Sequence, residues 1–383
     1  MKRWILLLSC LLLTACASVS PNPTVPTQLF NDALFEPPAQ PVRPEQIFAL
    51  TDGMKRYADT ELAAQVRAKG LRQGLLDALH RKNQLSLEYD AKRTRNAAEA
   101  FEARSGNCLS LVIMTAAFAK HMGLQVGYQS VYTDEIWTRK NDINFASGHV
   151  NVTLGPRMTE VTTRGGPTSW TIDFLPPEDL RGQRSREVSE STITAMYMNN
   201  RAAESLAEGD LNAAYAWARA AVAHEPGFLS AYNTLGVIYL RHGQAAAAEK
   251  VFAQVLQRDP ASTVAMSNLA RALSALGRAD EAAALTSRLA RIDPEPPFHF
   301  FDLGQAALRA GDNRSARDWF AKETARAPYD PEFHFWLAVA DFRLGHLDEA
   351  RKHLTLAMQS STQRSDRQLY AAKLDYLKHL SAQ

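Results

Sequence analysis

Residues 229–262 read LSAYNTLGVIYLRHGQAAAAEKVFAQVLQRDPAS, and this stretch sets a pattern that the second half of the chain repeats. Two apolar helical runs flank a glycine turn, and a proline closes the unit. Four registers recur every 34 residues: Pro226, Pro260, Pro294 and Pro328; Gly209, Gly243, Gly277, Gly311 and Gly345; Ala202, Gly236, Ala270, Gly304 and Ala338; and Ala214, Ala248, Ala282, Ala316 and Ala350. This period predicts stacked helix–turn–helix units whose small residues let paired helices approach closely.

The unit resembles the tetratricopeptide repeat through Tyr232, Leu235, Gly236, Tyr239, Gly243, Ala248, Phe252 and Pro260. The resemblance implies an all-α solenoid of five tetratricopeptide repeats over residues 195–364, closed by a cap helix over residues 365–383. Arg201 in the first unit and Thr362 in the fifth depart from the pattern, as is typical of terminal units. The groove of such a solenoid would bind a protein or peptide partner. Tyr232, Asn233 and Tyr239 are candidates to line it, although packing within the repeat is the better interpretation for the tyrosines.

The composition is that of a globular protein long enough for two domains. The chain has 383 residues, 46% of them hydrophobic, and a formal net charge of +2 at neutral pH. This charge lacks the strong basic field that general nucleic-acid binding needs, so we expect no nucleic acid as a partner. The apolar content is also not that of a protein that crosses a membrane several times.

The first residues have the layout of a bacterial export signal. Lys2 and Arg3 precede an apolar run over residues 4–13, which is too short to span a bilayer about 30 Å thick. The run ends in Leu13-Thr14-Ala15-Cys16, which resembles a lipobox.

The lipobox resemblance implies a signal peptide over residues 1–15 and lipidation of Cys16. Multiple acyl chains would anchor the mature protein firmly in a membrane. Ser18, rather than Asp, lies two places after Cys16, which by resemblance to Gram-negative lipoproteins favours the outer membrane, with the protein facing the periplasm. The alternative is an ordinary signal peptide that ends near Ala17.

Two polar stretches connect the expected domains. Residues 16–45 contain seven prolines and predict an extended tether, whose middle, Leu29 to Phe35, is apolar enough to dock on the domain. Residues 181–194 are rich in Arg and Glu and predict a solvated linker, with an anion-binding patch as the less favoured alternative.

Residues 46–180 predict an α+β domain. The pattern is helical to about residue 103, and residues 109–121 form an apolar helical run that is typical of a buried helix. After Gly123 the pattern alternates, which predicts strands of a small, mostly antiparallel sheet around Val126–Val131, Val150–Leu154 and Trp170–Phe174.

Cys108 is the cysteine that the export features leave unexplained. Cys10 would leave with the signal peptide and Cys16 would carry the lipid, whereas proteins of oxidising compartments normally pair their cysteines. Cys108 begins the buried helix, where free backbone N–H groups and the helix dipole favour a thiolate nucleophile and an oxyanion beside it. The alternative is an inert buried thiol.

His149 and Asp173 each lie on the polar side of a predicted strand, so we expect His149 to face a cleft or water. If these strands pair, both side chains project from one face of the sheet. Cys108, His149 and Asp173 would then supply a nucleophile, a base and an acid that orients the base. Taken singly, a surface histidine and a capping aspartate are the alternatives.

Residues 85–180 resemble the bacterial transglutaminase-like superfamily, which has a papain-like core. The motifs that carry the resemblance are RSGNCLS at residues 104–110, GHVNV at 148–152 and WTIDF at 170–174. The resemblance implies a transglutaminase-like domain in which Cys108 is the nucleophile, His149 the general base and Asp173 the residue that orients the histidine. The same resemblance suggests supporting roles, without any cofactor, for Asn107, Asn151 and Trp170.

The chain departs from that family at Asn151, where many members have Trp, and at Phe174, where Pro often follows the Asp. We predict a thiol hydrolase or acyltransferase that acts on amide bonds in the cell envelope. The alternative is a non-catalytic assembly scaffold whose repeats bind proteins. A zinc site is disfavoured because no Cys-x-x-Cys or His-x-x-x-His spacing is present. Residues 92–95 (KRTR) indicate a solvated helix start, with an Arg pairing a carboxylate, rather than a basic patch.

Overall fold

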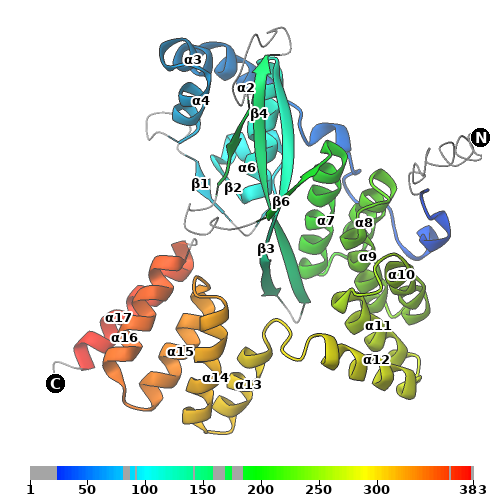
Figure 1. The fold of residues 1–383 in the computed structure, drawn as a ribbon, viewed down its shortest axis with the longest axis vertical. Coiled ribbons are helices and arrows are strands. Elements are labelled where there is room, and N and C mark those ends of the chain that lie inside the picture. Colours follow the sequence, from blue (N-terminus) through cyan, green and yellow to red (C-terminus); the bar gives the residue numbers. More distant parts are fainter. Residues whose placement is uncertain are drawn as a thin grey trace, which may run out of the picture.

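The chain consists of an α+β part followed by an array of paired helices (Figure 1). The structure, a computed structural model, describes residues 24–80, 87–90, 93–140, 143–157, 169–174, 184–361 and 364–380. The predicted signal peptide and Cys16 lie outside the described residues. Within the described residues, no helix has the length and apolar character needed to cross a membrane.

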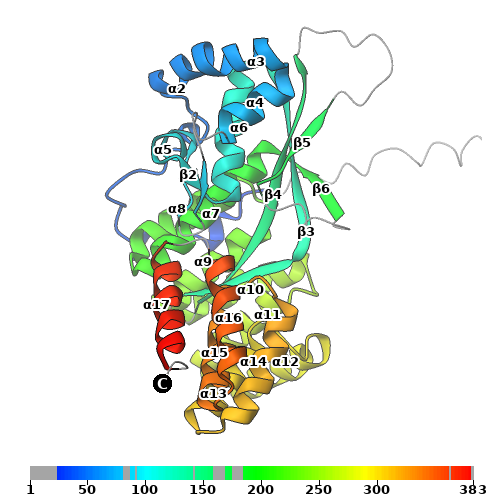
Figure 2. The same ribbon diagram turned by 90° about the vertical axis from the view of Figure 1, so that its left-hand side faces the viewer.

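Helix α6 (Cys108–His121) forms the centre of the α+β part. Its residues from Cys108 to Ala119 are all buried, which confirms the prediction of a buried helix. The sheet covers one side of α6, and the smaller helices lie around its other sides (Figure 2). These helices are α2 (Asp52–Tyr57), its continuation η4 (Ala58–Leu62), α3 (Ala63–Lys69), α4 (Leu71–His80) and α5 (Ala97–Ala103).

The main sheet is antiparallel and has the strand order β5-β4-β3-β6. Its strands are β3 (Leu124–Lys140), β4 (Ile143–Arg157), β5 (Trp170–Ile172) and β6 (Arg184–Val188). Val152 pairs with Tyr128 on one side and with Ile172 on the other, so the three predicted strands are neighbours in the sheet. Beyond the prediction, two short parallel strands, β1 (Glu88–Tyr89) and β2 (Ser105–Gly106), bring Glu88 beside Ser105 just before α6.

The prediction of a linker at residues 181–194 is wrong for residues 184–194, the part of this stretch that the structure describes. Residues 184–188 form β6, which pairs with β3, and helix α7 already begins at Glu190 after the cap residue Ser189. The sequence Arg-Ser-Arg-Glu-Val lacks apolar alternation because β6 is an edge strand whose residues stay largely exposed.

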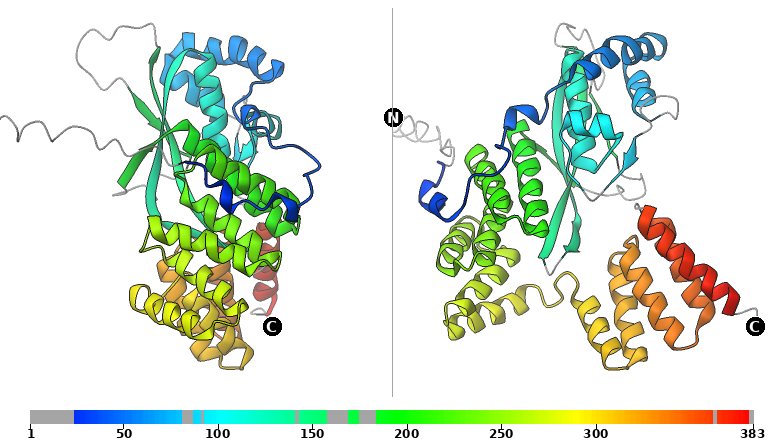
Figure 3. Two further views of the ribbon diagram at one scale, coloured as in Figure 1. Left: turned by 90° about the vertical axis from the view of Figure 1, so that its right-hand side faces the viewer. Right: turned by 180° about the vertical axis from the view of Figure 1, so that it is seen from behind.

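The described part of the predicted tether, residues 24–45, does not extend freely. It contains three short turns, η1 (Thr27–Leu29), η2 (Asp32–Leu34) and η3 (Pro44–Gln46). The segment runs beside the first helices of the repeat array (Figure 3). Leu29 is buried there, so the apolar middle docks on the repeats rather than on the α+β domain alone.

Ten helices form five pairs, as the 34-residue period predicts. The pairs are α7 (Glu190–Glu208) with α8 (Leu211–His224), α9 (Leu229–Arg241) with α10 (Ala245–Arg258), α11 (Thr263–Ala275) with α12 (Ala279–Ile292), α13 (His299–Arg309) with α14 (Asn313–Arg326), and α15 (Pro331–Arg343) with α16 (Leu347–Ser360). Helix α17 (Arg364–Leu380) packs on α16 as the predicted cap. Gly209 and its four repeats, up to Gly345, all have positive φ at the turn between paired helices.

The small-residue register explains how each pair packs. A Cβ added to Gly236 would lie 2.4 Å from the ring of Phe252, and one added to Gly304 would lie 2.6 Å from Phe320. The fifth unit has alanine at this register and leucine on the facing helix, and Ala338 and Leu354 share one apolar cluster. Glycine is therefore used where the partner helix presents a phenylalanine.

We predict that Gly236→Ala lowers the free energy of unfolding by about 1–3 kcal/mol, because the added methyl overpacks against Phe252. Adding Phe252→Leu should recover much of the loss, since it copies the pair found in the fifth unit. Urea denaturation measures both effects. Gly53→Ala is the control, since its new Cβ would have its nearest neighbour at 3.7 Å. Equal effects of Gly236→Ala and Gly53→Ala would contradict this account.

Candidate active site

Cys108 is the first residue of α6, and the residue before it fixes the start of the helix. The side chain of Asn107 accepts a hydrogen bond from the backbone N–H of Ser110 at 2.9 Å, which makes Asn107 the N-cap. Cys108 carries a reduced thiol and has an exposed fraction of 9%. The thiol therefore lies at the positive end of the helix dipole, as predicted.

His149 and Asp173 form a close pair. The imidazole Nε2 of His149 lies 2.7 Å and 2.8 Å from the two carboxylate oxygens of Asp173. Asn151 adds its Nδ2 at 3.4 Å from the same carboxylate. The pairing of β4 with β5 sets this arrangement, because Val152 is in register with Ile172 and Asp173 follows directly.

Cys108 lies against the same imidazole. A hydrogen bond and charge attraction from Cys108 both act on His149. The second ring nitrogen, Nδ1, is buried and has no nitrogen or oxygen partner among the described residues. The ring of His149 is therefore held by Asp173 through Nε2.

The surroundings of His149 favour its charged form. Burial by itself would lower the pKa of His149, but the hydrogen bonds with Asp173 and Cys108 and the attraction of both groups raise it to about 9. His149 does not face open water, one of the two surroundings expected for it, since only 2% of this residue is accessible. The folded domain covers the polar side of β4, which the alternation pattern cannot reveal.

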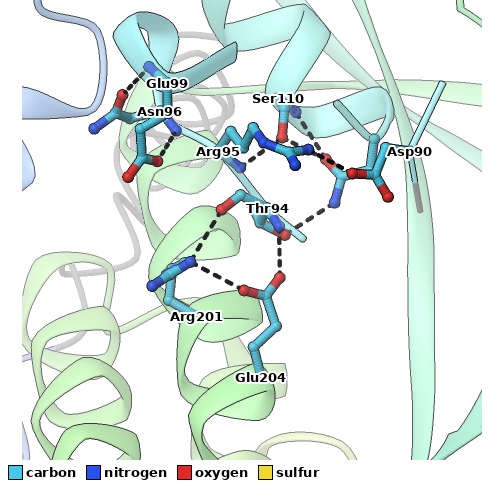
Figure 4. Close-up of polar contacts among 9 residues, drawn as sticks. Asp90, Thr94, Arg95, Asn96, Glu99, Ser110, Arg201 and Glu204 are labelled. Atoms are coloured by element: carbon cyan, nitrogen blue, oxygen red, sulfur yellow. Dashed lines mark hydrogen bonds and ion pairs between the residues drawn. The ribbon is translucent and has the colours of Figure 1, made fainter. Parts of the chain in front are cut away.

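A partly buried polar cluster, which includes the buried Thr94 and Ser110, holds the start of α6 in place (Figure 4). Asn107 donates a hydrogen bond from Nδ2 to the hydroxyl of Thr94 at 2.9 Å. The hydroxyl of Ser110 donates to Asn107 and accepts from the backbone N–H of Arg95 at 2.8 Å. Arg95 in turn pairs with Asp90 at 2.7 Å, which is the predicted pairing of an Arg in residues 92–95 with a carboxylate.

The first repeat helix completes this cluster. The carboxylate of Glu204 accepts from the backbone N–H of Thr94 at 2.6 Å, and Arg201 donates to the carbonyl oxygen of Thr94 at 3.3 Å. Arg201 also pairs with Glu204 at 3.2 Å. Burial raises the pKa of Glu204, although its hydrogen bonds with Thr94 and its Arg neighbours oppose the shift. Sequence reasoning missed this link, and Arg201, noted only as an irregular position, was the available signal.

The other predicted residues are placed as follows. Trp170 begins β5, is half-buried, and pairs in register with Leu154. Tyr232 is buried and donates to the carbonyl oxygen of Pro226, which precedes its own unit. Tyr239 is buried and binds the N-terminal segment instead. Asn233 is half-buried, and its side-chain oxygen has no hydrogen-bond partner among the described residues.

The described residues include no group of three or more His, Cys, Asp or Glu side chains arranged to hold a metal ion.

Comparison with known families matches the tetratricopeptide repeat over residues 239–299 and again over residues 301–363. The C-terminal part of the chain therefore contains tetratricopeptide repeats, as predicted. Neither match reaches the α+β part, so the transglutaminase-like resemblance stays a prediction. No match to a curated protein was found.

Three solved structures are similar to part of this chain. A thermophilic TPR protein from Thermus thermophilus is 20% identical, with a TM-score of 0.31 over 47% of this chain and 98% of that chain. The MamA protein is 18% identical, with a TM-score of 0.26 over 45% and 93%. Pseudomonas aeruginosa PilF is 18% identical, with a TM-score of 0.31 over 50% and 87%.

We predict that the contribution of His149 to stability falls in alkaline solution. Because its pKa is raised from 6.5 to about 9 on folding, this stabilisation is full below pH 6.5 and is lost as the pH rises through about 9. The difference in free energy of unfolding between wild type and His149→Gln should shrink by roughly 1–3 kcal/mol between about pH 7 and about pH 10. Urea denaturation at both pH values measures it.

The exposed His224 supplies the matched control for this experiment. His224→Gln should change stability equally at both pH values. The same pH dependence in both variants would contradict the assignment of a raised pKa to His149.

Proposed function

We propose that this chain is a protein-binding scaffold of the bacterial cell envelope, in which the tetratricopeptide repeats hold a protein partner. The observation that carries the proposal is that the repeats already bind a polypeptide segment through its backbone. Tyr239 donates to the carbonyl oxygen of Leu29 at 2.8 Å, and the backbone N–H of Asn31 donates to the same hydroxyl at 3.0 Å. Binding through main-chain groups is how repeat surfaces can hold extended partners.

Cysteine chemistry is a second candidate function. A specific observation favours it: Asp173 holds the imidazole of His149 at Nε2, and Cys108 acts on the same imidazole. In this proposal the thiolate of Cys108 attacks an amide carbonyl, and His149 transfers its proton to the leaving amine. The resulting thioester is released by water in a hydrolase or by an amine in an acyltransferase. Asp173 keeps the imidazole oriented throughout.

Lipid anchoring in the outer membrane belongs to the proposal as well. It rests on the sequence before Cys16 and on Ser18. Anchoring would keep both the repeats and Cys108 close to envelope proteins and peptides, which are the partners that either function needs.

For the scaffold, we predict that a photo-crosslinking amino acid at Tyr329, which is 62% exposed on the repeats, captures a defined envelope protein in cells. The same product should form in the Cys108→Ala background, and that variant should restore a deletion strain. A crosslinker at Lys55, exposed on α2, is the control and should not give this product. Identical products from both positions, or none from the repeats, would remove the scaffold proposal.

For the cysteine chemistry, we predict that iodoacetamide labels Cys108 faster than a free cysteine at neutral pH. His149→Ala should slow labelling by about tenfold or more, because the imidazolium that favours the thiolate is gone. Mass spectrometry of the tryptic peptide measures the rate. His121→Ala is the control, since His121 pairs with Asp59 on the surface of the same part. A rate equal to that of free cysteine and independent of His149 would exclude the second candidate.

A further inference from the structure

The N-terminal segment at residues 27–36 lies on the repeats as a peptide ligand would. We call this stretch the docked segment, and the residues that hold it, the segment-binding surface, are Asn212, Tyr215, Arg219, Tyr239 and His242. The surface comes from helix α8, from the end of α9 and from the turn after it. Figure 3 shows the segment, in dark blue, running beside these helices.

The main chain of the docked segment is bound at three points. The backbone N–H of Asn31 donates to the hydroxyls of Tyr215 and Tyr239, each at 3.0 Å. The hydroxyl of Tyr239 donates to the carbonyl oxygen of Leu29. The backbone N–H of Glu36 donates to the side-chain oxygen of Asn212 at 3.1 Å. These contacts fix the path of the segment without selecting its side chains.

Two side chains of the docked segment, the carboxylate of Asp32 and the ring of Phe35, make the contacts that can select its sequence. The carboxylate of Asp32 accepts three hydrogen bonds. Arg219 donates two of them, from Nε at 2.7 Å and from Nη2 at 3.1 Å, and the hydroxyl of Tyr215 donates the third at 2.7 Å. Three residues later, the ring of Phe35 stacks on Tyr215, with centroids 4.0 Å apart and planes at 6°, and meets His242 at 4.7 Å. A two-pronged guanidinium contact and a stacked ring together recognise an acidic residue followed by an aromatic one.

The polar groups of these residues are not part of the repeat pattern. One unit later in the 34-residue register, Tyr215 and Arg219 are replaced by Glu249 and Ala253. Tyr239 and His242 are likewise replaced by leucines, at residues 273 and 276. The polar groups of the segment-binding surface are therefore specific to the first two units, whereas the rings of Tyr215 and Tyr239 also pack in the apolar core.

Leu29 anchors the docked segment in the apolar core, whereas the ion pair of Asp32 with Arg219 lies open to water. Asp32 and Arg219 keep 60% and 42% of their side chains exposed, and an ion pair this open adds selectivity more than affinity. Its attachment to the same chain raises its effective concentration at the surface, which compensates for weak intrinsic binding. A stronger or multivalent competitor can therefore take its place.

We propose that the segment-binding surface recognises protein segments of the form Asp-x-x-Phe, and that residues 27–36 are a built-in copy of this ligand which a partner protein displaces. The inference rests on the proposed function and specifies the chemistry of the partner protein. The partner segment has a carboxylate three residues before an aromatic ring. Its backbone is available for hydrogen bonds with two tyrosine hydroxyls.

The test uses a fluorescein-labelled peptide of residues 27–37 (TQLFNDALFEP) and the full chain, measured by fluorescence anisotropy. In Asp32→Ala/Phe35→Ala, whose own segment is weakened, the peptide should bind about tenfold tighter or more than in wild type. Adding Arg219→Ala should weaken that binding about tenfold. Adding Arg271→Ala, an exposed arginine on α11, should leave it unchanged. A peptide with Asn in place of Asp32 should lose affinity in parallel with Arg219→Ala.

The proposal is overturned if the opened chain, shown to be folded by its thermal melt, binds the peptide no better than wild type. It is also overturned if binding survives Arg219→Ala. Should the double variant fail to fold, Phe35→Leu opens the surface more gently and the same outcomes apply. Dimers that form when wild type is concentrated and vanish in Phe35→Leu would show a second copy as the occupant, against a separate partner. A crosslink from Tyr329 that persists while the peptide fails would leave the scaffold function standing and remove this inference alone.

Discussion

The buried cluster around Thr94 ties the start of the cysteine helix to the first repeat helix. Thr94 is only 1% exposed, so its backbone groups and hydroxyl must find partners inside the protein. They find them on both sides, at Asn107 before α6 and at Arg201 and Glu204 on α7. An unpaired buried polar group costs about 1–3 kcal/mol, so these groups hold one another in place. The position of Cys108 thus depends on where the first repeat lies.

The apolar core continues the same connection. One cluster of buried residues runs from Leu29 through α6 and the sheet to Ala272 on α11, so the docked segment, the α+β part and the first repeats pack as one body. Helices α13–α15 have a core of their own around Phe298, Phe320 and Phe333. The chain therefore combines a cysteine-bearing body, with its own segment bound to it, and a further set of repeats that packs separately.

Local sequence patterns predicted most of the fold and many residues of the candidate site. The 34-residue period indicated the five helix pairs, because the same close contact, such as Gly236 with Phe252, recurs in each register or is replaced by an alanine with a smaller partner. Alternation indicated three of the strands, and their pairing brings His149 next to Asp173. Strand β6 escaped prediction because an exposed edge strand needs no apolar side. The Thr94 cluster and the docking of Asp32 escaped it because a buried or paired polar residue looks the same in sequence as a solvated one.

The sequence by itself determined the helices, the strands and the kinds of side chain at the site, since these follow from periodicity, turn residues and the chemistry of Cys, His and Asp. Only the tertiary structure decided the pKa of His149 and the position of the N-terminal segment on the repeats. The pKa of His149 depends on burial and on two neighbours distant in the chain. The docking of residues 27–36 depends on Tyr215, Arg219 and Tyr239, nearly two hundred residues away. Such contacts join groups whose separation along the chain carries no periodic signal, so they exist only once the helices are packed.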